Sequence, residues 1–215
     1  MAIITMSRQV GSRASELANR MCDEMGLVAF DKSLMAQVAA NVGLGEQEVI
    51  DYSEDEYEKR GFFEALFRRP RALGEVSMWV DSQTRTVRQL DEEDAIGLIR
   101  STINAAYKRG DVLVVGRGGQ AVLENRPGVL HLRVVAPFED RVLQVQASES
   151  LTAAQARRLI EERDAAQREY LRMFHHIDVD DATLYHMVLN TGKLSLDQCL
   201  GLIKAAVQAL PSAAA

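Results

Sequence analysis

Five short apolar segments recur along the chain, and longer stretches with a helical spacing of apolar residues separate them. The segments cover residues 2–6, 27–30, 111–115, 129–136 and 184–190. Near-continuous apolar strands that alternate with helices are typical of a parallel sheet with helices on both faces. The pattern therefore predicts an α/β domain built on a five-stranded parallel sheet.

Two stretches interrupt this alternation. Residues 32–109 show helical patterns and no strand signal, which predicts a helical insertion after the second strand. Residues 151–174 predict a long helix before the fifth strand, and residues 195–210 predict a final helix. Because Gln198 follows Ser195 by three residues, Ser195 is the expected N-cap of a capping box.

Composition narrows the class of protein. With 215 residues, 47% hydrophobic and 26% charged, the chain is long enough for one well-buried domain. No apolar run approaches the length that spans a bilayer, no secretory signal pattern opens the chain, and Cys22 and Cys199 are expected to be reduced thiols. These features predict a cytoplasmic protein without a membrane partner. A net charge of −6 argues against a nucleic-acid partner and favours small molecules.

The first apolar segment opens directly into a Gly/Ser turn, and a helical pattern follows it. Such a unit turns backbone N–H groups toward an anion, as in the phosphate loop G-x-x-x-x-G-K-[ST]. Aligning Gly11 and Ser12 with that loop puts Arg13 on the second glycine, Ala14 on the lysine and Ser15 on the hydroxyl that holds magnesium. Since the lysine is absent, an ordinary strand–helix turn and an altered phosphate loop both remain open.

A second Gly-rich turn follows the third apolar segment, where parallel sheets bind ligands. Gly116-x-Gly118-x-x-Ala121 is similar to a dinucleotide fingerprint, but residues 136–137 are Ala-Pro where that motif needs an acidic residue. Arg117 stands between these glycines and suits bidentate recognition of a phosphate or a ring. An arginine at the surface of a turn is the alternative.

Asp31 ends the second apolar segment, so we expect it at the same edge of the sheet as the two Gly-containing turns. A carboxylate at this place could orient an acceptor hydroxyl or a magnesium-bound water. It could equally be the N-cap of the helix expected from Lys32.

Charged side chains share one face of the helix predicted over residues 151–174. They are Arg157, Glu161, Asp164, Arg168 and Arg172. A solvated, salt-bridged face explains them, and so does a lid whose arginines close over phosphates. Arg8, Arg13 and Arg141 would add cations near the same edge of the sheet.

Taken in order, the chain resembles the cytidylate-kinase-like proteins among the P-loop nucleoside monophosphate kinases. The residues that carry the likeness are Ile3, Thr5, Ser7 and Arg8 with Gly11 and Ser12, residues 30–31, 114–118 and 130–137 with Arg141, Ala156, residues 164–170, and residues 185–191 with 194–195. The resemblance implies a P-loop kinase-type three-layer α/β/α fold with a helical acceptor insertion and a lid. It divides the single domain 1–215 into a core of residues 1–31, 110–148 and 184–210, an insertion of residues 32–109 and a lid of residues 149–180.

The resemblance also implies an ATP-dependent phosphotransferase that uses Mg²⁺ and moves a phosphoryl group to CMP or a similar small acceptor. Its donor phosphates would be bound by Ser7, Arg8, Gly11, Ser12, Arg13, Ser15 and Arg141, with Ser15 also near the magnesium. The acceptor would be bound by Asp31, Arg117 and Asp164, and catalysis would involve Arg13, Asp31 and Arg168.

The chain departs from the family pattern at two places in the phosphate machinery. Arg13 and Ala14 stand where the family loop has glycines, and Gln167 stands where the lid pattern has an arginine, with Arg168 one residue late. Two hypotheses follow. In the first, Arg13 replaces the lysine of an active kinase. In the second, the chain is a kinase-like pseudoenzyme that binds a nucleotide or a protein partner without efficient catalysis.

Overall fold

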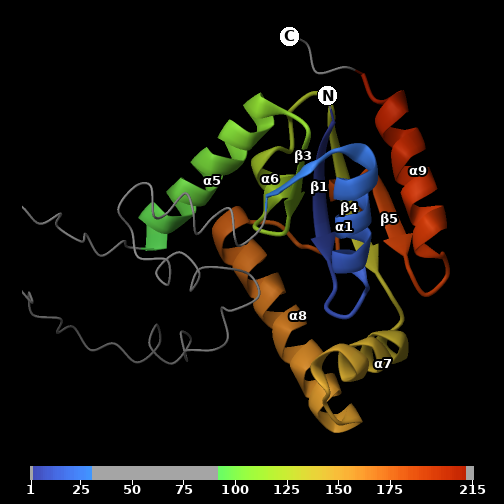
Figure 1. Cartoon of the computed structure of the whole chain (residues 1–215). Coiled ribbons are helices and arrows are strands. Elements are labelled where there is room, and N and C mark those ends of the chain that lie inside the picture. Colours follow the sequence, from blue (N-terminus) through green and yellow to red (C-terminus); the bar gives the residue numbers. More distant parts are fainter. Residues whose placement is uncertain (1, 31–91, 212–215) are drawn as a thin grey trace, which may run out of the picture.

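The computed structural model describes residues 2–30 and 92–211, and the other residues of the chain lie outside this description. Figure 1 shows a central sheet with helices on both sides of it. The helical patterns expected between residues 32 and 80 and the site residue Asp31 therefore fall outside the described part of the chain.

The sheet has five strands, all parallel, in the order β2-β3-β1-β4-β5. Its strands are β1 (Ile3–Arg8), β2 (Val28–Phe30), β3 (Val112–Val115), β4 (Val129–Val135) and β5 (Met187–Asn190). All five predicted strands are confirmed, and so is their parallel pairing. The fifth begins later than predicted because Ala182–Leu184 forms a short 3-10 helix, η1, in which the Thr183 N–H donates to the capping Asp181 side chain.

Six α-helices are described. They are α1 (Ala14–Met25), α5 (Glu92–Arg109), α6 (Gly119–Val122), α7 (Phe138–Glu149), α8 (Ala153–His175) and α9 (Leu196–Ala209). Capping boxes begin α8 and α9, the latter formed by Ser195 and Gln198 as predicted. None of the helices in the described ranges is apolar over a length that would cross a bilayer.

The side chains of β1 divide between two cores, which explains why its sequence is almost continuously apolar. Ile3 packs with residues of α5 and α8 on one face of the sheet. Ile4 and Met6 pack with residues of α1 and α9 on the other face. This arrangement confirms the predicted three-layer α/β/α fold of P-loop kinase type.

One face of the sheet also carries a buried polar strip. Thr5 and Ser7 of β1 lie in register with His131 and Arg133 of β4. The Thr5 hydroxyl and the His131 Nδ1 atom are hydrogen-bonded at 2.7 Å, and an Nη atom of Arg133 donates to the Ser7 hydroxyl at 3.0 Å. A second Nη atom of Arg133 contacts Asp180 at 2.6 Å. Each polar side chain of the strip thus has a partner.

The turns that follow β1 and β3 leave the same edge of the sheet, as predicted. Met6 and Val115 are in register, and the Gly116 N–H donates to the Met6 carbonyl at 2.9 Å. In Figure 1, α7 and the first turns of α8 lie beyond this edge. The edge and these two helices frame the site.

Candidate functional site

The turn between β1 and α1 exposes the start of a helix. Gly11 (φ = 75°) and Arg13 (φ = 57°) both adopt the left-handed conformation, and the Ser12 hydroxyl and N–H both donate to the Gln9 carbonyl. Arg13 is the N-cap of α1 and provides no side-chain cap. The first N–H groups of a helix have no partner within the helix, so this uncapped start of α1 is suited to an anion.

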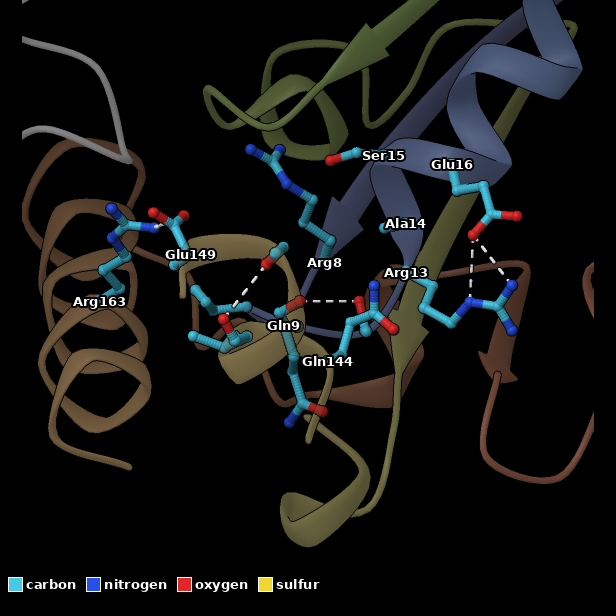
Figure 2. A pocket seen from close by; sticks show the side chains of 14 residues that line it. Arg8, Gln9, Arg13, Ala14, Ser15, Glu16, Gln144, Glu149 and Arg163 are labelled. Carbon is cyan, nitrogen blue, oxygen red and sulfur yellow. Dashed lines mark hydrogen bonds and ion pairs between the residues drawn. The ribbon is translucent and has the colours of Figure 1, made fainter. Parts of the chain in front are cut away.

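A cavity of about 380 Å³ lies over this turn. Its walls are formed by residues 8–16, by Gln144, Val145, Ser148 and Glu149 of α7, and by Arg163 of α8. Figure 2 shows the labelled side chains around it. The cavity therefore joins the start of α1 to the two helices that follow β4.

The cations around the cavity have different orientations. The guanidinium of Arg13 pairs with Glu16 through Nη2 at 2.9 Å and Nε at 3.2 Å, and it is about half exposed. The Nη1 atom of Arg163 lies 3.8 Å from the Oε1 atom of Glu149. In Figure 2 the guanidinium of Arg8 lies on the same side of the turn as the Ser15 hydroxyl, whereas that of Arg13 lies on the other side. The structure thus directs Arg13 outward rather than into the cavity.

A buried ion pair fixes the turn from behind. An Nη atom of Arg141 on α7 lies 2.6 Å from a carboxylate oxygen of Asp164 on α8, and their side chains are only 7% and 12% exposed. Val10 is held by both residues, because its N–H donates to Asp164 at 3.2 Å and its carbonyl accepts from Arg141 at 3.3 Å. We call these three residues the loop clamp.

The sequence assigned Arg141 to the phosphates and Asp164 to the acceptor, and the structure brings the two into contact with each other. It also separates Asp164 from the other charged residues on its face of α8, since Arg157 and Arg172 are exposed and pair with Glu139 and Glu169. Asp164 lies at the border of the buried side of the helix, where α7 supplies its partner.

Gly11 is packed against the backbone of α7. A Cβ atom at this position would lie 2.7 Å from the Arg141 carbonyl oxygen and 3.0 Å from a Val145 methyl group. We expect Gly11→Ala to lower the free energy of unfolding by about 2 kcal/mol, because a left-handed conformation and a backbone clash act together. Chemical denaturation measures this.

The matched control is Gly26→Ala. Gly26 is also left-handed, at φ = 67°, but no atom lies within 4 Å of the point that a Cβ atom would occupy there. The free energy of unfolding of this variant should fall by only about 1 kcal/mol, which is the cost of placing alanine in a left-handed conformation. Equal losses in the two variants would contradict the tight packing of Gly11 on α7.

The remaining predicted site residues lie at different depths. Ser7 is buried behind the turn, where its hydroxyl accepts from Arg133. Arg168 is exposed on α8, and Arg117 is buried with φ = 57°. Of the predicted phosphate ligands, the structure gathers these around the cavity: Arg8, Gly11, Ser12, Arg13 and Ser15.

The Gly116 turn is covered by the end of α8. Three successive residues, Gly116, Arg117 and Gly118, are left-handed. The ring of His175 occupies the space that a Cβ atom of Gly118 would need. Burial, with a contribution from the positive charge of Arg100, lowers the pKa of His175 to about 4. At neutral pH this ring is therefore uncharged and acts as a packing group over the turn.

Sequence reasoning missed the cavity wall that α7 and α8 provide. Gln144 and Ser148 are one helical turn apart, as are Val145 and Glu149, so one stripe of α7 faces the turn after β1. Polar residues at a spacing of four in the helix after β4 are a signal that could have indicated this wall. The contact between His175 and Gly118 has no comparable signal.

The hydroxyl of Ser15, at the start of α1, is the group in the cavity that the phosphate-loop motif assigns to magnesium. Within residues 2–30 and 92–211 no group of three or more His, Cys, Asp or Glu side chains is arranged to hold a metal. Mg²⁺ prefers to keep several waters and to be bound through a few protein oxygens together with substrate phosphates. A magnesium ion that entered with nucleotide phosphates would find the Ser15 hydroxyl as a protein oxygen at this cavity.

Residues 3–193 match the sequence model of the cytidylate kinase-like family. The chain belongs to this family. The family assignment covers the turn after β1, the Gly116 turn and both helices of the cavity wall, and it confirms the resemblance read from the sequence.

Several relatives of this cytidylate kinase-like chain carry the name cytidylate kinase. The protein from Methanopyrus kandleri is 30% identical over 113 residues, which cover 49% of this chain and 58% of the relative. The protein from Methanosphaerula palustris is 34% identical over 46% of this chain and 54% of the relative. The chain thus matches little more than half the length of these two. The protein from Pyrococcus horikoshii is 24% identical, over 97% of this chain and 89% of the relative.

Solved structures with a similar fold include an uncharacterized protein from Eubacterium ventriosum. It has a TM-score of 0.66 and 14% sequence identity, and the match covers 97% of this chain and 99% of that protein. A Thermus thermophilus protein has a TM-score of 0.51 and 17% identity over 95% of this chain and 97% of that protein. These similarities support the fold of the cytidylate kinase-like chain.

Proposed function

We propose that this protein is an ATP-dependent phosphotransferase that transfers a phosphoryl group to CMP or a similar small acceptor. The donor phosphates bind at the turn between β1 and α1, and Mg²⁺ enters with them near Ser15. The acceptor binds toward the Gly116 turn at the same edge of the sheet. Membership of the cytidylate kinase-like family and the names of the relatives support this proposal.

The observation that carries the proposal is the conformation of the turn after β1. Gly11 and Arg13 are left-handed, and the turn leads into an α1 N-terminus without a side-chain cap that opens on a cavity. Successive backbone N–H groups in such a turn form an anion-binding concavity. A polyphosphate is the anionic group that a kinase brings to such a concavity.

The acceptor side of the proposal uses Arg117, in the turn after β3 beside β1, and Asp31, which the family resemblance supplies. Arg117 would recognise the acceptor, and Asp31 would orient its attacking group, as the family resemblance implies. Arg168, exposed on α8, would approach the transferring phosphate if α8 moves toward the turn. Asp164 would act indirectly, by holding Val10 in place through the loop clamp.

The test measures ADP formation from ATP and Mg²⁺ with CMP, UMP or AMP as acceptor, and with cytidine as the matched control that lacks a phosphate. We expect one nucleoside monophosphate to raise the rate above the acceptor-free rate, while cytidine does not. Absence of ATP binding by calorimetry would overturn the proposal as a whole.

A second candidate function is nucleotide binding without efficient catalysis. The observation that favours it is Ala14, which is 2% exposed and stands where the phosphate-loop motif has its lysine. Tight ATP binding without transfer to any of the acceptors would favour this pseudoenzyme over the kinase.

A further inference from the structure

We infer that Arg8 takes the place of the missing lysine and provides the cation that binds the outer phosphates of ATP. This inference rests on the proposed function and assigns one residue of the proposed donor site. It replaces the hypothesis, made from the sequence, that Arg13 has this role.

The alignment with the motif leaves two arginines at the turn. In G-x-x-x-x-G-K-[ST] the lysine binds the outer phosphates as a point charge. When Ser15 is placed on the motif hydroxyl, Ala14 falls on the lysine, and Arg8 and Arg13 fall on the two glycines. Compared with this motif, the chain lacks the lysine and carries an arginine at each of the two glycine positions.

Geometry separates the two arginines. They differ in the direction of the side chain: the guanidinium of Arg13 contacts Glu16 through two atoms and points away from Ser15. Glu16 also lies 3.4 Å from Arg20, so it joins an ion-pair network on the outer side of α1. Turning Arg13 inward would break this contact and leave Glu16 with only the longer one.

Arg8 approaches the cavity from the end of β1. It is the last residue of that strand, is half-buried and lines the cavity together with Ser15. In the view of Figure 2 its guanidinium lies on the same side of the turn as the Ser15 hydroxyl, whereas that of Arg13 lies on the other side. In the phosphate-loop motif this hydroxyl lies beside the magnesium and the outer phosphates. The guanidinium thus lies on the side of the turn where the lysine would act.

An arginine at this place changes the way in which phosphate is held. A guanidinium presents a planar fork of donors that matches two phosphate oxygens, whereas an ammonium acts as a point charge. Arg8 is half-buried at the strand end, so its side chain has less conformational freedom to lose on binding than a fully exposed arginine. The contact is to phosphate oxygens alone, so the base of the nucleotide is not recognised by Arg8.

The experiment compares the wild-type protein with Arg8→Gln, Arg8→Lys and Arg13→Gln by calorimetry. The ligands are ATP–Mg²⁺, inorganic tripolyphosphate and AMP. A charge-assisted contact of this kind corresponds to about a ten- to hundredfold change in affinity. Arg8→Gln should lower the affinity for ATP and for tripolyphosphate by this factor. It should change the affinity for AMP by less than about threefold, because AMP lacks the outer phosphates. Arg8→Lys should recover part of the loss.

Arg20→Gln is the matched control, since Arg20 lies on α1, is partly exposed and pairs with Glu16 and Asp197 without lining the cavity. It removes the same charge and should leave all three affinities unchanged. Arg13→Gln should lower the affinity for ATP by less than about threefold. Thermal melting of each variant confirms that it is folded.

Several results would overturn the inference. They are an Arg8→Gln variant that binds ATP as well as or better than wild type, an Arg13→Gln variant that loses as much affinity as Arg8→Gln, and an equal loss for ATP and AMP. A wild-type protein that binds neither ATP nor tripolyphosphate would refute the proposed function instead. The two failures are therefore distinguishable.

Discussion

Arg141→Met should lower the free energy of unfolding by about 3–5 kcal/mol, the largest loss that we expect from a single substitution outside the hydrophobic core. Removal of the arginine leaves the Asp164 carboxylate, 12% exposed, with the Val10 N–H as its described hydrogen-bond donor. A buried charge that has lost its partner keeps its desolvation cost and loses the attraction that offset it. Urea denaturation monitored by circular dichroism measures the loss.

The double variant Arg141→Met, Asp164→Leu separates the charge effect from the loss of packing. Replacing both members of a buried pair by apolar side chains of similar size is often close to neutral. The double variant should therefore recover most of the stability lost in the single variant. A single-variant loss below about 1 kcal/mol would show that water screens the pair in solution, as it does for surface ion pairs.

Acidification from pH 6.5 to pH 4 should destabilise the protein through His131 by up to about 3 kcal/mol. Burial of this side chain, 4% exposed, and the nearby His186 lower the pKa of His131 to about 4. In the unfolded chain the same group has a pKa near 6.5, so the unfolded state binds the proton first as the pH falls. The stabilisation is thus complete above pH 6.5 and is lost as the pH falls to 4.

His131→Gln provides the comparison, because glutamine can still hydrogen-bond to the Thr5 hydroxyl but carries no titrating group. Groups that do not interact with His131 also titrate in this range, and their contributions cancel in the difference between wild type and variant. The difference therefore reports His131 together with its coupling to His186. The free energy of unfolding should fall less steeply with acid in the variant. Identical slopes for the two proteins would contradict the burial of a neutral imidazole in the sheet.

The sheet could be predicted from the sequence because its strands are short runs rich in apolar residues, which pack into helical layers on both faces. Ile3 and Ile4 enter different cores, so the signal is continuous and does not depend on contacts distant in the sequence. The prediction failed at the start of β5, where Leu184 and Tyr185 extend the apolar segment. Asp181 caps a 3-10 turn there, and this local hydrogen bond overrides the apolar pattern.

The sequence predicts the backbone turn of the site but not the directions and contacts of its charged side chains. The turn at Gly11 follows from the residues beside it, since a Gly/Ser turn between a strand and a helix has few conformations. The direction of the Arg13 side chain depends on a rotamer and on Glu16, which the motif alignment ignores. The pairing of Arg141 with Asp164 depends on how α7 and α8 pack, and helical spacing does not fix that contact.

The loop clamp has a consequence for the evolution of the chain. Arg141 and Asp164 lie on different helices, and each buried charge is offset only while the other is present. A lineage that replaces the arginine alone passes through a protein with an unpaired buried charge, and selection removes such an intermediate. The two charged positions are therefore expected to change together among relatives, whereas Gly11 is held by the backbone of α7 whatever side chain stands at position 141.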